Sequence, residues 1–173
     1  MPTSYALLDA GGKRRLERFG PLVLDRPAPA ATASPRLPAA WSTADLRFDP
    51  SRGWSAASDH SAGLAAPGQA IPREPWTIEV AGLALELRPT SSGGVGLYPE
   101  HATNLPWLHA EVRAAVTTKG SAEVLNLFAH TGLATLAAAR AGASVAHVDA
   151  SRSAVDWARR NAELSALADR PIR

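Results

Sequence analysis

The residues best suited to chemistry follow two apolar stretches in the C-terminal half of the chain, 122–128 and 144–148. After the first comes the loop Ala129-His130-Thr131-Gly132, whose backbone N–H groups could face an anionic group at the start of a helix. After the second comes Asp149, whose carboxylate can accept two hydrogen bonds from a ribose. Asp149 lies 17 residues beyond Gly132, near the spacing of about 20 in nucleotide-binding units. The pattern indicates a cofactor that contains adenosine.

The single glycine of this loop, Gly132, limits the type of cofactor. A pyrophosphate is usually bound by G-x-G-x-x-G, because the backbone must approach it closely. NAD and FAD are therefore disfavoured, whereas S-adenosylmethionine (SAM), which carries an amino acid in place of phosphates, needs fewer glycines. A second interpretation stays open, in which Gly132 marks an ordinary connection and Asp149 only caps the following helix.

The elements that must position these residues are indicated by hydrophobic periodicity. The patterns predict a helix over 102–117, a strand over 122–128, a helix over 133–140 that Gly142 ends, a strand over 144–148 and a helix over 153–167. Ser153 and Asp156 have the spacing of a capping box for the last helix. Strand–helix–strand–helix order predicts a parallel α/β sheet with right-handed crossovers, whose ligands bind beyond the carboxyl ends of the strands.

The N-terminal half has a different pattern. Short strands are expected at 5–8 and 21–24, and a hairpin is expected at 76–88 about Ala81-Gly82. Stretches rich in Ala, Pro and Ser, 27–38 and 55–75, predict exposed connections, and Trp41, Trp54 and Trp76 are expected to anchor a small β-rich core. We therefore expect a β-rich module with Ala/Pro-rich loops over 1–95, and the first part of a Rossmann-like domain over 96–173.

Composition excludes several classes of protein. The 173 residues contain no cysteine, so disulfides and thiolate metal sites are excluded, and no apolar stretch is long enough to span a membrane. A cytoplasmic protein without metal or membrane attachment is expected. The net charge of +2 does not itself indicate nucleic-acid binding. One dense basic cluster, Lys13, Arg14, Arg15 and Arg18, is either a solvated face or a grip for RNA backbone.

A family resemblance rests on three segments. The segment "VLNLFAHTGLATLAAARAGASVAHVDASRSAVDWARRNAELSAL" resembles the nucleotide-binding motifs of class I SAM-dependent methyltransferases, in the branch of bacterial 23S ribosomal RNA methyltransferases. "GVGLYPEHATNLPWL" is similar to the segment before the methyltransferase sheet in this branch, and "YALLDAGGKRRLERFGPLVLDRP" is similar to its N-terminal β module. Together these segments cover most of the chain.

The resemblance implies roles for individual residues. Phe128, His130, Thr131 and Gly132 would wrap the methionine part of SAM, Asp149 would hold the ribose hydroxyls, and Ala150 and Ser151 would lie beside the adenine. Asn126 completes the candidate cofactor-binding set. His130 stands where relatives usually have Tyr, and His101 where they usually have Gln, so either histidine could instead be an ordinary surface residue.

The implied function is methylation of a base in ribosomal RNA, with SAM as the methyl donor. The family's later Asp-Pro-Pro motif, which positions the target base, does not occur by residue 173, so we expect the catalytic residues beyond the chain and the cofactor-binding half within it. Such a fragment would be inactive alone and would leave an unpaired strand edge and a bare apolar sheet face. The alternatives are a non-catalytic RNA- or protein-binding module with a vestigial α/β part and, with weaker support, an NAD-dependent oxidoreductase. The sequence leaves the oligomeric state open.

Overall fold

The structure is a computed structural model that describes residues 4–57, 72 and 74–173. Within it the chain divides into two compact units, one formed by 1–78 and 87–95 and the other by 79–86 and 96–173. The expected domains, 1–95 and 96–173, stay a prediction. Most of the expected connection at 55–75 lies outside the described residues.

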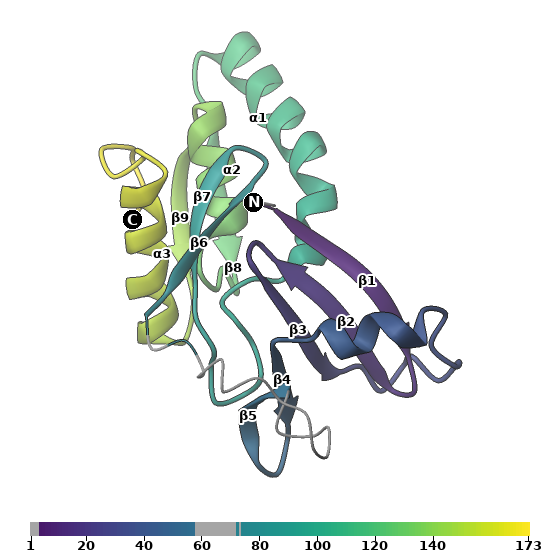
Figure 1. The fold of residues 1–173 in the computed structure, drawn as a ribbon. Coiled ribbons are helices and arrows are strands. Elements are labelled where there is room, and N and C mark those ends of the chain that lie inside the picture. The colour runs from purple at the N-terminus through teal and green to yellow at the C-terminus, as the bar shows by residue number, and fades with distance from the viewer. Residues whose placement is uncertain (1–3, 58–71, 73) are drawn as a thin grey trace. The chain divides into compact units, whose positions relative to one another are not determined.

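The first unit is built on a five-stranded sheet (Figure 1). Its strands are β1 (Tyr5–Gly11), β2 (Arg14–Phe19), β3 (Leu22–Pro27), β4 (Leu46–Asp49) and β5 (Gly53–Ala56), paired in that order. β3 and β4 run parallel, and the other neighbours are antiparallel. Gly12 and Lys13, both with positive φ, make the tight turn between β1 and β2. Leu16, Phe19, Leu24 and Leu46 are buried in the core of this unit.

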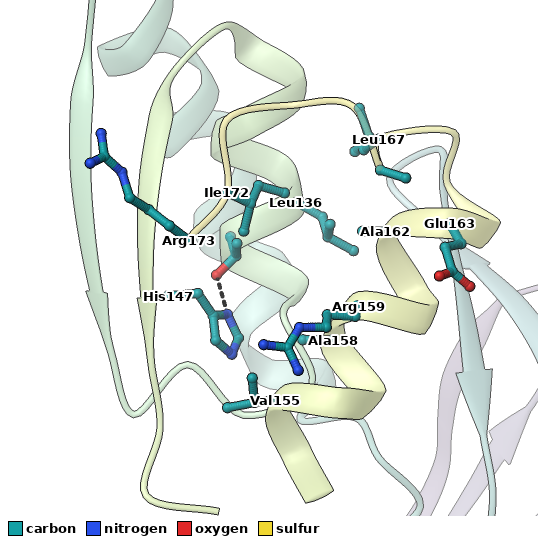
Figure 2. A pocket seen from close by; sticks show the side chains of 12 residues that line it. Leu136, His147, Val155, Ala158, Arg159, Ala162, Glu163, Leu167, Ile172 and Arg173 are labelled. Atoms are coloured by element: carbon teal, nitrogen blue, oxygen red, sulfur yellow. Dashed lines mark hydrogen bonds between the residues drawn. The ribbon is translucent and has the colours of Figure 1, made fainter. Parts of the chain in front are cut away.

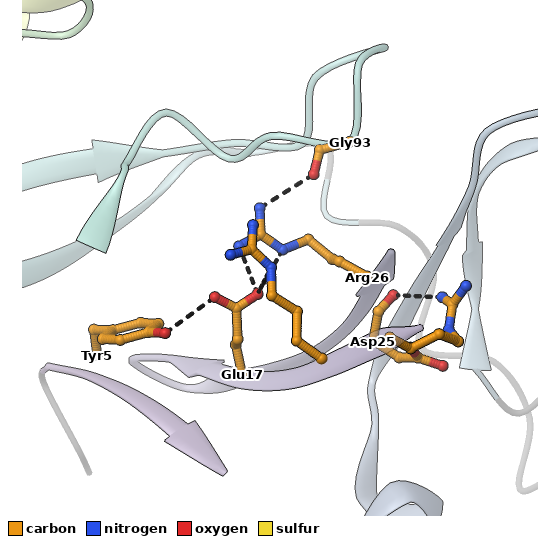
Figure 3. Close-up of polar contacts among 7 residues, drawn as sticks. Tyr5, Glu17, Asp25, Arg26 and Gly93 are labelled. Atoms are coloured by element: carbon orange, nitrogen blue, oxygen red, sulfur yellow. Dashed lines mark hydrogen bonds and ion pairs between the residues drawn. The ribbon is translucent and has the colours of Figure 1, made fainter. Parts of the chain in front are cut away.

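Sequence patterns did not predict β2, because a charged side chain breaks its alternation. Glu17 is fully buried and accepts hydrogen bonds from Tyr5 Oη at 3.1 Å and from Arg26 Nη2 at 2.6 Å. Arg26, also buried, donates to the carbonyl of Gly93 at 3.2 Å (Figure 3). Arg15 Nε lies 3.0 Å from Glu17 Oε2. Buried charges need such partners. The carboxylate of Glu17 therefore holds β2 to β1 and β3.

The Ala/Pro-rich connection after β3 is mostly exposed, as predicted, but one carboxylate anchors its end. Asp9 is buried and accepts hydrogen bonds from the backbone N–H groups of Arg36 and Leu37 and from the indole of Trp41. These bonds lower the pKa of Asp9, the Trp41 bond most strongly. Trp41 lies in a 3-10 helix, η1 (Pro38–Thr43). Trp41 is half-buried, so it fixes the connection to β1 through Asp9 and does not fill the core of the unit.

The predicted hairpin is confirmed. β6 (Trp76–Val80) and β7 (Leu83–Leu87) form a two-stranded sheet around Ala81 and Gly82, whose φ angles are 50° and 75°. Two consecutive positive φ values are typical of the turn that suits a two-residue hairpin.

The second unit contains the predicted parallel pair. Its elements are η3 (Pro99–Asn104), α1 (Leu105–Lys119), β8 (Glu123–Leu127), α2 (Leu133–Ala141), β9 (Ser144–Val148) and α3 (Arg152–Leu164). β8 and β9 pair in parallel from Glu123 opposite Ser144 to Leu127 opposite Val148. A core of small side chains lies between helices and sheet, among them Ala138, Ala139 and Val145. The predicted α/β fold class is confirmed.

Two helix starts differ from the prediction. The segment expected as one helix from residue 102 begins as the 3-10 turn η3 and becomes α-helical at Leu105, where Pro106 occupies the first turn. The capping box at Ser153 is wrong. Ser151 is the N-cap of α3, and its Oγ accepts the N–H of Ala154 at 3.3 Å.

Apolar side chains on the sheet of the second unit are exposed. Leu125 is 64% exposed, Leu127 54% and Val148 47%. The expected bare apolar face is therefore present. Residue Ile172 forms a parallel bridge with Val145, so the edge of β9 away from β8 has a partner. Among the described residues, no helix combines the length and apolar character needed to cross a bilayer.

Replacing Glu17 tests the buried charge cluster. Glu17→Gln leaves the Arg26 guanidinium buried without its counter-charge, which should lower the free energy of unfolding by about 3 to 5 kcal/mol. Urea unfolding monitored by circular dichroism and tryptophan fluorescence measures the change. The matched control, Asp156→Asn, breaks the exposed pair with Arg159 and should cost less than about 1 kcal/mol. Equal losses in the two variants would contradict this account of β2.

Candidate cofactor-binding site

The loops after β8 and β9 meet at one edge of the parallel pair. The N–H of Ala129 donates to the carbonyl of Val148 at 3.1 Å. The Asp149 carboxylate then accepts the N–H of His130 through Oδ2 and the N–H of Ser151 through Oδ1, each at 2.8 Å. One side chain thus ties both predicted loops together.

The hydrogen bonds of Asp149 define its charge state. The Ser151 N–H and then the His130 N–H lower the pKa of Asp149 below its ordinary value of 3.8. The group therefore stays ionised at neutral pH, and each oxygen keeps acceptor capacity for a ligand hydroxyl. Because Ser151 caps α3, Asp149 is not the helix cap that the second interpretation required.

The backbone of the first loop has an unusual conformation. Phe128, His130 and Gly132 have φ angles of 53°, 50° and 94°. Left-handed φ costs about 1 to 2 kcal/mol for a residue with a side chain, and surrounding contacts must offset this cost. The Phe128 side chain is 89% exposed. The loop therefore exposes the Phe128 side chain, buries Ala129 and Thr131, and directs the N–H of His130 toward Asp149.

Thr131 is buried and anchors the loop to Gly96 and to α3. Its hydroxyl donates to the carbonyl of Gly96, and its own carbonyl accepts Nδ2 of Asn161 at 2.9 Å. Asn161, fully buried on α3, also accepts the N–H of Glu86 at 2.8 Å. A Cβ at Gly96, whose φ is 88°, would lie 2.2 Å from the Trp157 ring, so the chain can pass there only as glycine. Sequence reasoning missed Asn161 and Gly96.

Asn126 points away from the loop. Its Nδ2 donates to Thr135 Oγ1 at 2.9 Å, and that oxygen lies 2.9 Å from His147 Nδ1. Burial lowers the pKa of His147. His147 lines a cavity of about 350 Å³ between β9, α2 and α3 (Figure 2). Within the described residues, none of the predicted cofactor-binding residues lines this larger cavity. The Asn126 side chain is bonded to α2 through Thr135 and not to the loop.

The predicted loop lines a second, smaller cavity of about 90 Å³. Its wall consists of 126–134 together with Leu97, Tyr98 and His101. The Tyr98 ring lies 4.7 Å from the His130 ring and 5.8 Å from the His101 ring, centre to centre. Burial lowers the pKa of His130, the Asp149 charge opposes that effect, and His101 adds to it. We did not single out Tyr98 from the sequence, although it begins the Tyr-Pro-Glu-His stretch.

The structure therefore brings most of the predicted set to one place. Residues 128–132 and Asp149 surround the meeting point of the two loops, and Ala150 and Ser151 are exposed beside it. The binding of a cofactor by these residues stays a prediction.

Solved structures of known proteins resemble the chain over most of its length. A SAM-dependent methyltransferase from Agrobacterium tumefaciens superposes on 98% of the chain with a TM-score of 0.84 and 35% identity, and the chain covers 51% of that protein. Over nearly its whole length, this chain is therefore similar to part of a SAM-dependent methyltransferase. A methyltransferase of this kind from Streptococcus mutans shares the fold, with a TM-score of 0.66 at 16% identity over 95% of this chain and 43% of its own.

Proteins with similar sequences have names that specify ribosomal RNA. "Ribosomal RNA large subunit methyltransferase K/L" from Stutzerimonas stutzeri is 38% identical over 91 residues, which are 49% of this chain and 13% of that protein. The protein of the same name from Magnetococcus marinus is 36% identical over 85 residues, 49% of this chain and 11% of its own. The chain thus spans a small part of these relatives and about half of the Agrobacterium protein. No protein-family model matches the chain.

Replacing Asn161 tests how the loop of residues 128–132 is held in place. Asn161→Leu has similar volume but leaves the Thr131 carbonyl and the Glu86 N–H buried without partners, so unfolding should become about 2 to 4 kcal/mol easier. Hydrogen exchange should also speed up at the amides of His130 and Gly132. The control Glu163→Leu changes an exposed position of the same helix and should have little effect. Equal behaviour of the two variants would contradict the anchoring role of Asn161.

Proposed function

We propose that the second unit binds SAM and that the protein transfers its methyl group to a base of large-subunit ribosomal RNA. In this proposal Asp149 accepts the ribose hydroxyls, and the loop of Phe128, His130, Thr131 and Gly132 surrounds the methionine part. Ala150 and Ser151 lie beside the adenine. The carrying observation is the Asp149 carboxylate, ionised and fixed by amides from both loops.

The chemistry of SAM suits this site. A ribose diol donates two hydrogen bonds, and an ionised carboxylate with fixed orientation accepts them without further reorganisation. The amino acid end of SAM carries a carboxylate, which favours the N-terminal end of α2 just after Gly132. Only one glycine is needed, because no pyrophosphate has to approach the backbone.

Methyl transfer requires positioning more than acid–base chemistry from these residues. The carbon–sulfur bond breaks with its electron pair left on sulfur, and a lone pair of the target base forms the new bond to carbon. The base then loses a proton to solvent or to a nearby acceptor, which leaves S-adenosylhomocysteine (SAH) and the methylated base. Holding donor and acceptor in line supplies much of the rate. A base within a duplex is out of reach, so the target would be single-stranded or flipped out.

The names of the relatives support the RNA substrate. Proteins with the name "Ribosomal RNA large subunit methyltransferase K/L" are 36–38% identical over about half of this chain. A methyltransferase structure that contains SAH shares the fold at 17% identity, with a TM-score of 0.62. Action on ribosomal RNA would place the protein in the cytoplasm.

Asp149→Ala tests the cofactor proposal. Loss of the charged acceptor should weaken SAH binding about ten- to a hundredfold, measured by isothermal titration calorimetry. Asp149→Asn, which keeps the shape and one acceptor oxygen, should fall between. The control Asp156→Ala removes an exposed acid of α3 and should leave the dissociation constant unchanged. An unchanged dissociation constant in Asp149→Ala would contradict the ribose contact.

The same titrations separate the alternative functions. SAH should raise the melting temperature of the wild-type chain, whereas NADH should not. Stabilisation by NADH alone would favour an oxidoreductase. No stabilisation by either ligand, together with retained RNA binding, would favour a non-catalytic module.

Only two of the four residues of the basic cluster, Lys13 and Arg18, remain candidates for contact with RNA. Arg14 pairs with Asp25 and donates to the carbonyl of Phe48, and Arg15 pairs with Glu17, so both are engaged within the first unit. Among the described residues, Lys13 and Arg18 form no ion pair, and Lys13 is exposed. We propose that these two side chains contact RNA phosphates.

Charge reversal tests that contact. Lys13→Glu with Arg18→Glu should weaken RNA binding and reduce the slope of log K against log salt by about 1.4 to 1.8. The control reverses two exposed charges of α1, Arg113→Glu with Lys119→Glu, and has the same net charge. A filter-binding titration at several salt concentrations measures both. Equal loss in the two double variants would indicate a general charge effect and contradict a specific contact.

A further inference from the structure

The His130 ring lies in the wall of the smaller cavity of the second unit, together with Tyr98 and His101. The His130 ring is half-buried and packs against Tyr98 at 4.7 Å between ring centres. The N–H of the same residue is bonded to Asp149 Oδ2 at 2.8 Å. The backbone of residue 130 thus contacts the carboxylate that the proposed function assigns to the ribose, and the charge of that carboxylate acts on the imidazole.

The chemistry of SAM places its charge nearby. Its sulfonium sulfur is attached directly to the 5′ carbon of the ribose, so a ribose bound to Asp149 brings a fixed positive charge close to residue 130. SAH has the same ribose and the same amino acid, but its sulfur is an uncharged thioether. Donor and product thus differ at this point by a methyl group and one unit of charge.

We propose that His130 discriminates the methyl donor from the demethylated product by charge, admitting the sulfonium when the imidazole is neutral and disfavouring it when the imidazole is protonated. The inference rests on the proposed function, because it requires the ribose on Asp149. It adds a specificity-determining residue to the proposed cofactor site.

Several charged or titratable groups surround His130. Asp149 at the end of β9 stabilises the imidazolium, whereas His101 on η3 destabilises it. Tyr98 contributes a neutral ring, and Glu100 lies on the same 3-10 turn as His101. His147 interacts with Asp149 from β9. Burial is the largest influence and lowers the pKa of His130 below 6.5. At neutral pH the ring is therefore uncharged, which is the state that accepts the donor.

The sign and size of the effect follow from Coulomb's law. Two unit charges about 8 Å apart repel by an amount that changes affinity about threefold at the dielectric constant of water and about thirtyfold at that of a protein surface. Below the pKa of His130, the ratio of the SAM to the SAH dissociation constant should rise by a factor in that range. Above that pKa, the ratio should be constant. The ammonium and carboxylate groups shared by the two ligands largely cancel in the ratio.

The test measures both dissociation constants by calorimetry from about pH 8 down to the lowest pH at which circular dichroism shows the protein still folded, because the pKa of His130 lies below its ordinary value. In the wild-type chain we expect the SAM/SAH ratio to rise as pH falls, about three- to thirtyfold. His130→Asn should give a flat ratio, and asparagine tolerates the positive φ of this position. His130→Tyr provides a second neutral variant. The control His109→Gln removes an exposed histidine of α1 and should retain the rise.

Replacing His101 gives a second test, because the direction of the resulting pKa change at His130 can be predicted. Its charge lowers the pKa of His130. His101→Gln should therefore raise the pKa of His130, and the rise in the ratio should begin at higher pH. By reciprocity of linkage, the pKa of His130 from imidazole NMR signals should be lower with SAM bound than with SAH bound.

Three results would overturn the inference. A constant ratio in the wild-type chain with both ligands bound overturns this inference alone and leaves the proposed function standing. An equal rise in the wild-type chain, His130→Asn and His130→Tyr places the charge effect elsewhere. Failure of both ligands to bind at every pH overturns the proposed function, and this inference with it.

Discussion

The candidate site depends on one interaction, the acceptance of two backbone N–H groups by the Asp149 carboxylate. One N–H belongs to His130 in the loop after β8, and the other to Ser151 in the loop after β9. Parallel pairing brings these loops to the same edge, but pairing alone does not fix their separation. The Asp149 carboxylate fixes the separation of the two loops, because hydrogen bonds to an ionised group are short and directional. The same charge is then available to a ligand in a fixed position.

The rest of the second unit resists the strain that this arrangement creates. Left-handed φ at Phe128 and His130 is unfavourable, and the buried Thr131 between Ala129 and Gly132 is tied on both sides. Asn161 binds both the carbonyl of Thr131 and the N–H of Glu86 in the hairpin, so residues far apart in sequence hold the loop 128–132. Such a loop is set before a ligand arrives, which lowers the ordering cost of binding. Gly132 turns the chain into α2 with a φ of 94°, at a point where a Cβ would lie 3.0 Å from the Cβ of Ala158.

Local patterns predicted the parts of this fold that local forces determine. Strand 144–148, helix 133–140 with its Gly142 end, and the hairpin about Ala81-Gly82 follow from periodicity and turn chemistry, and the structure confirms them. The meeting of loop 129–132 with Asp149 also followed, since parallel strands end at the same edge. Three features did not follow: strand β2 with its buried Glu17, the N-cap at Ser151 in place of Ser153, and the Asn161 link. Each depends on a partner distant in sequence or on a choice between equivalent serines, which leaves no periodic trace.

The most direct test is to map where SAH binds in the wild-type chain by following backbone amide signals in NMR during a titration. The account predicts saturable shifts that are largest at the N–H groups of His130 and Ser151, since both are bonded to the carboxylate that would accept the ribose. Shifts concentrated around the His147 cavity, with those two amides unmoved, would contradict it.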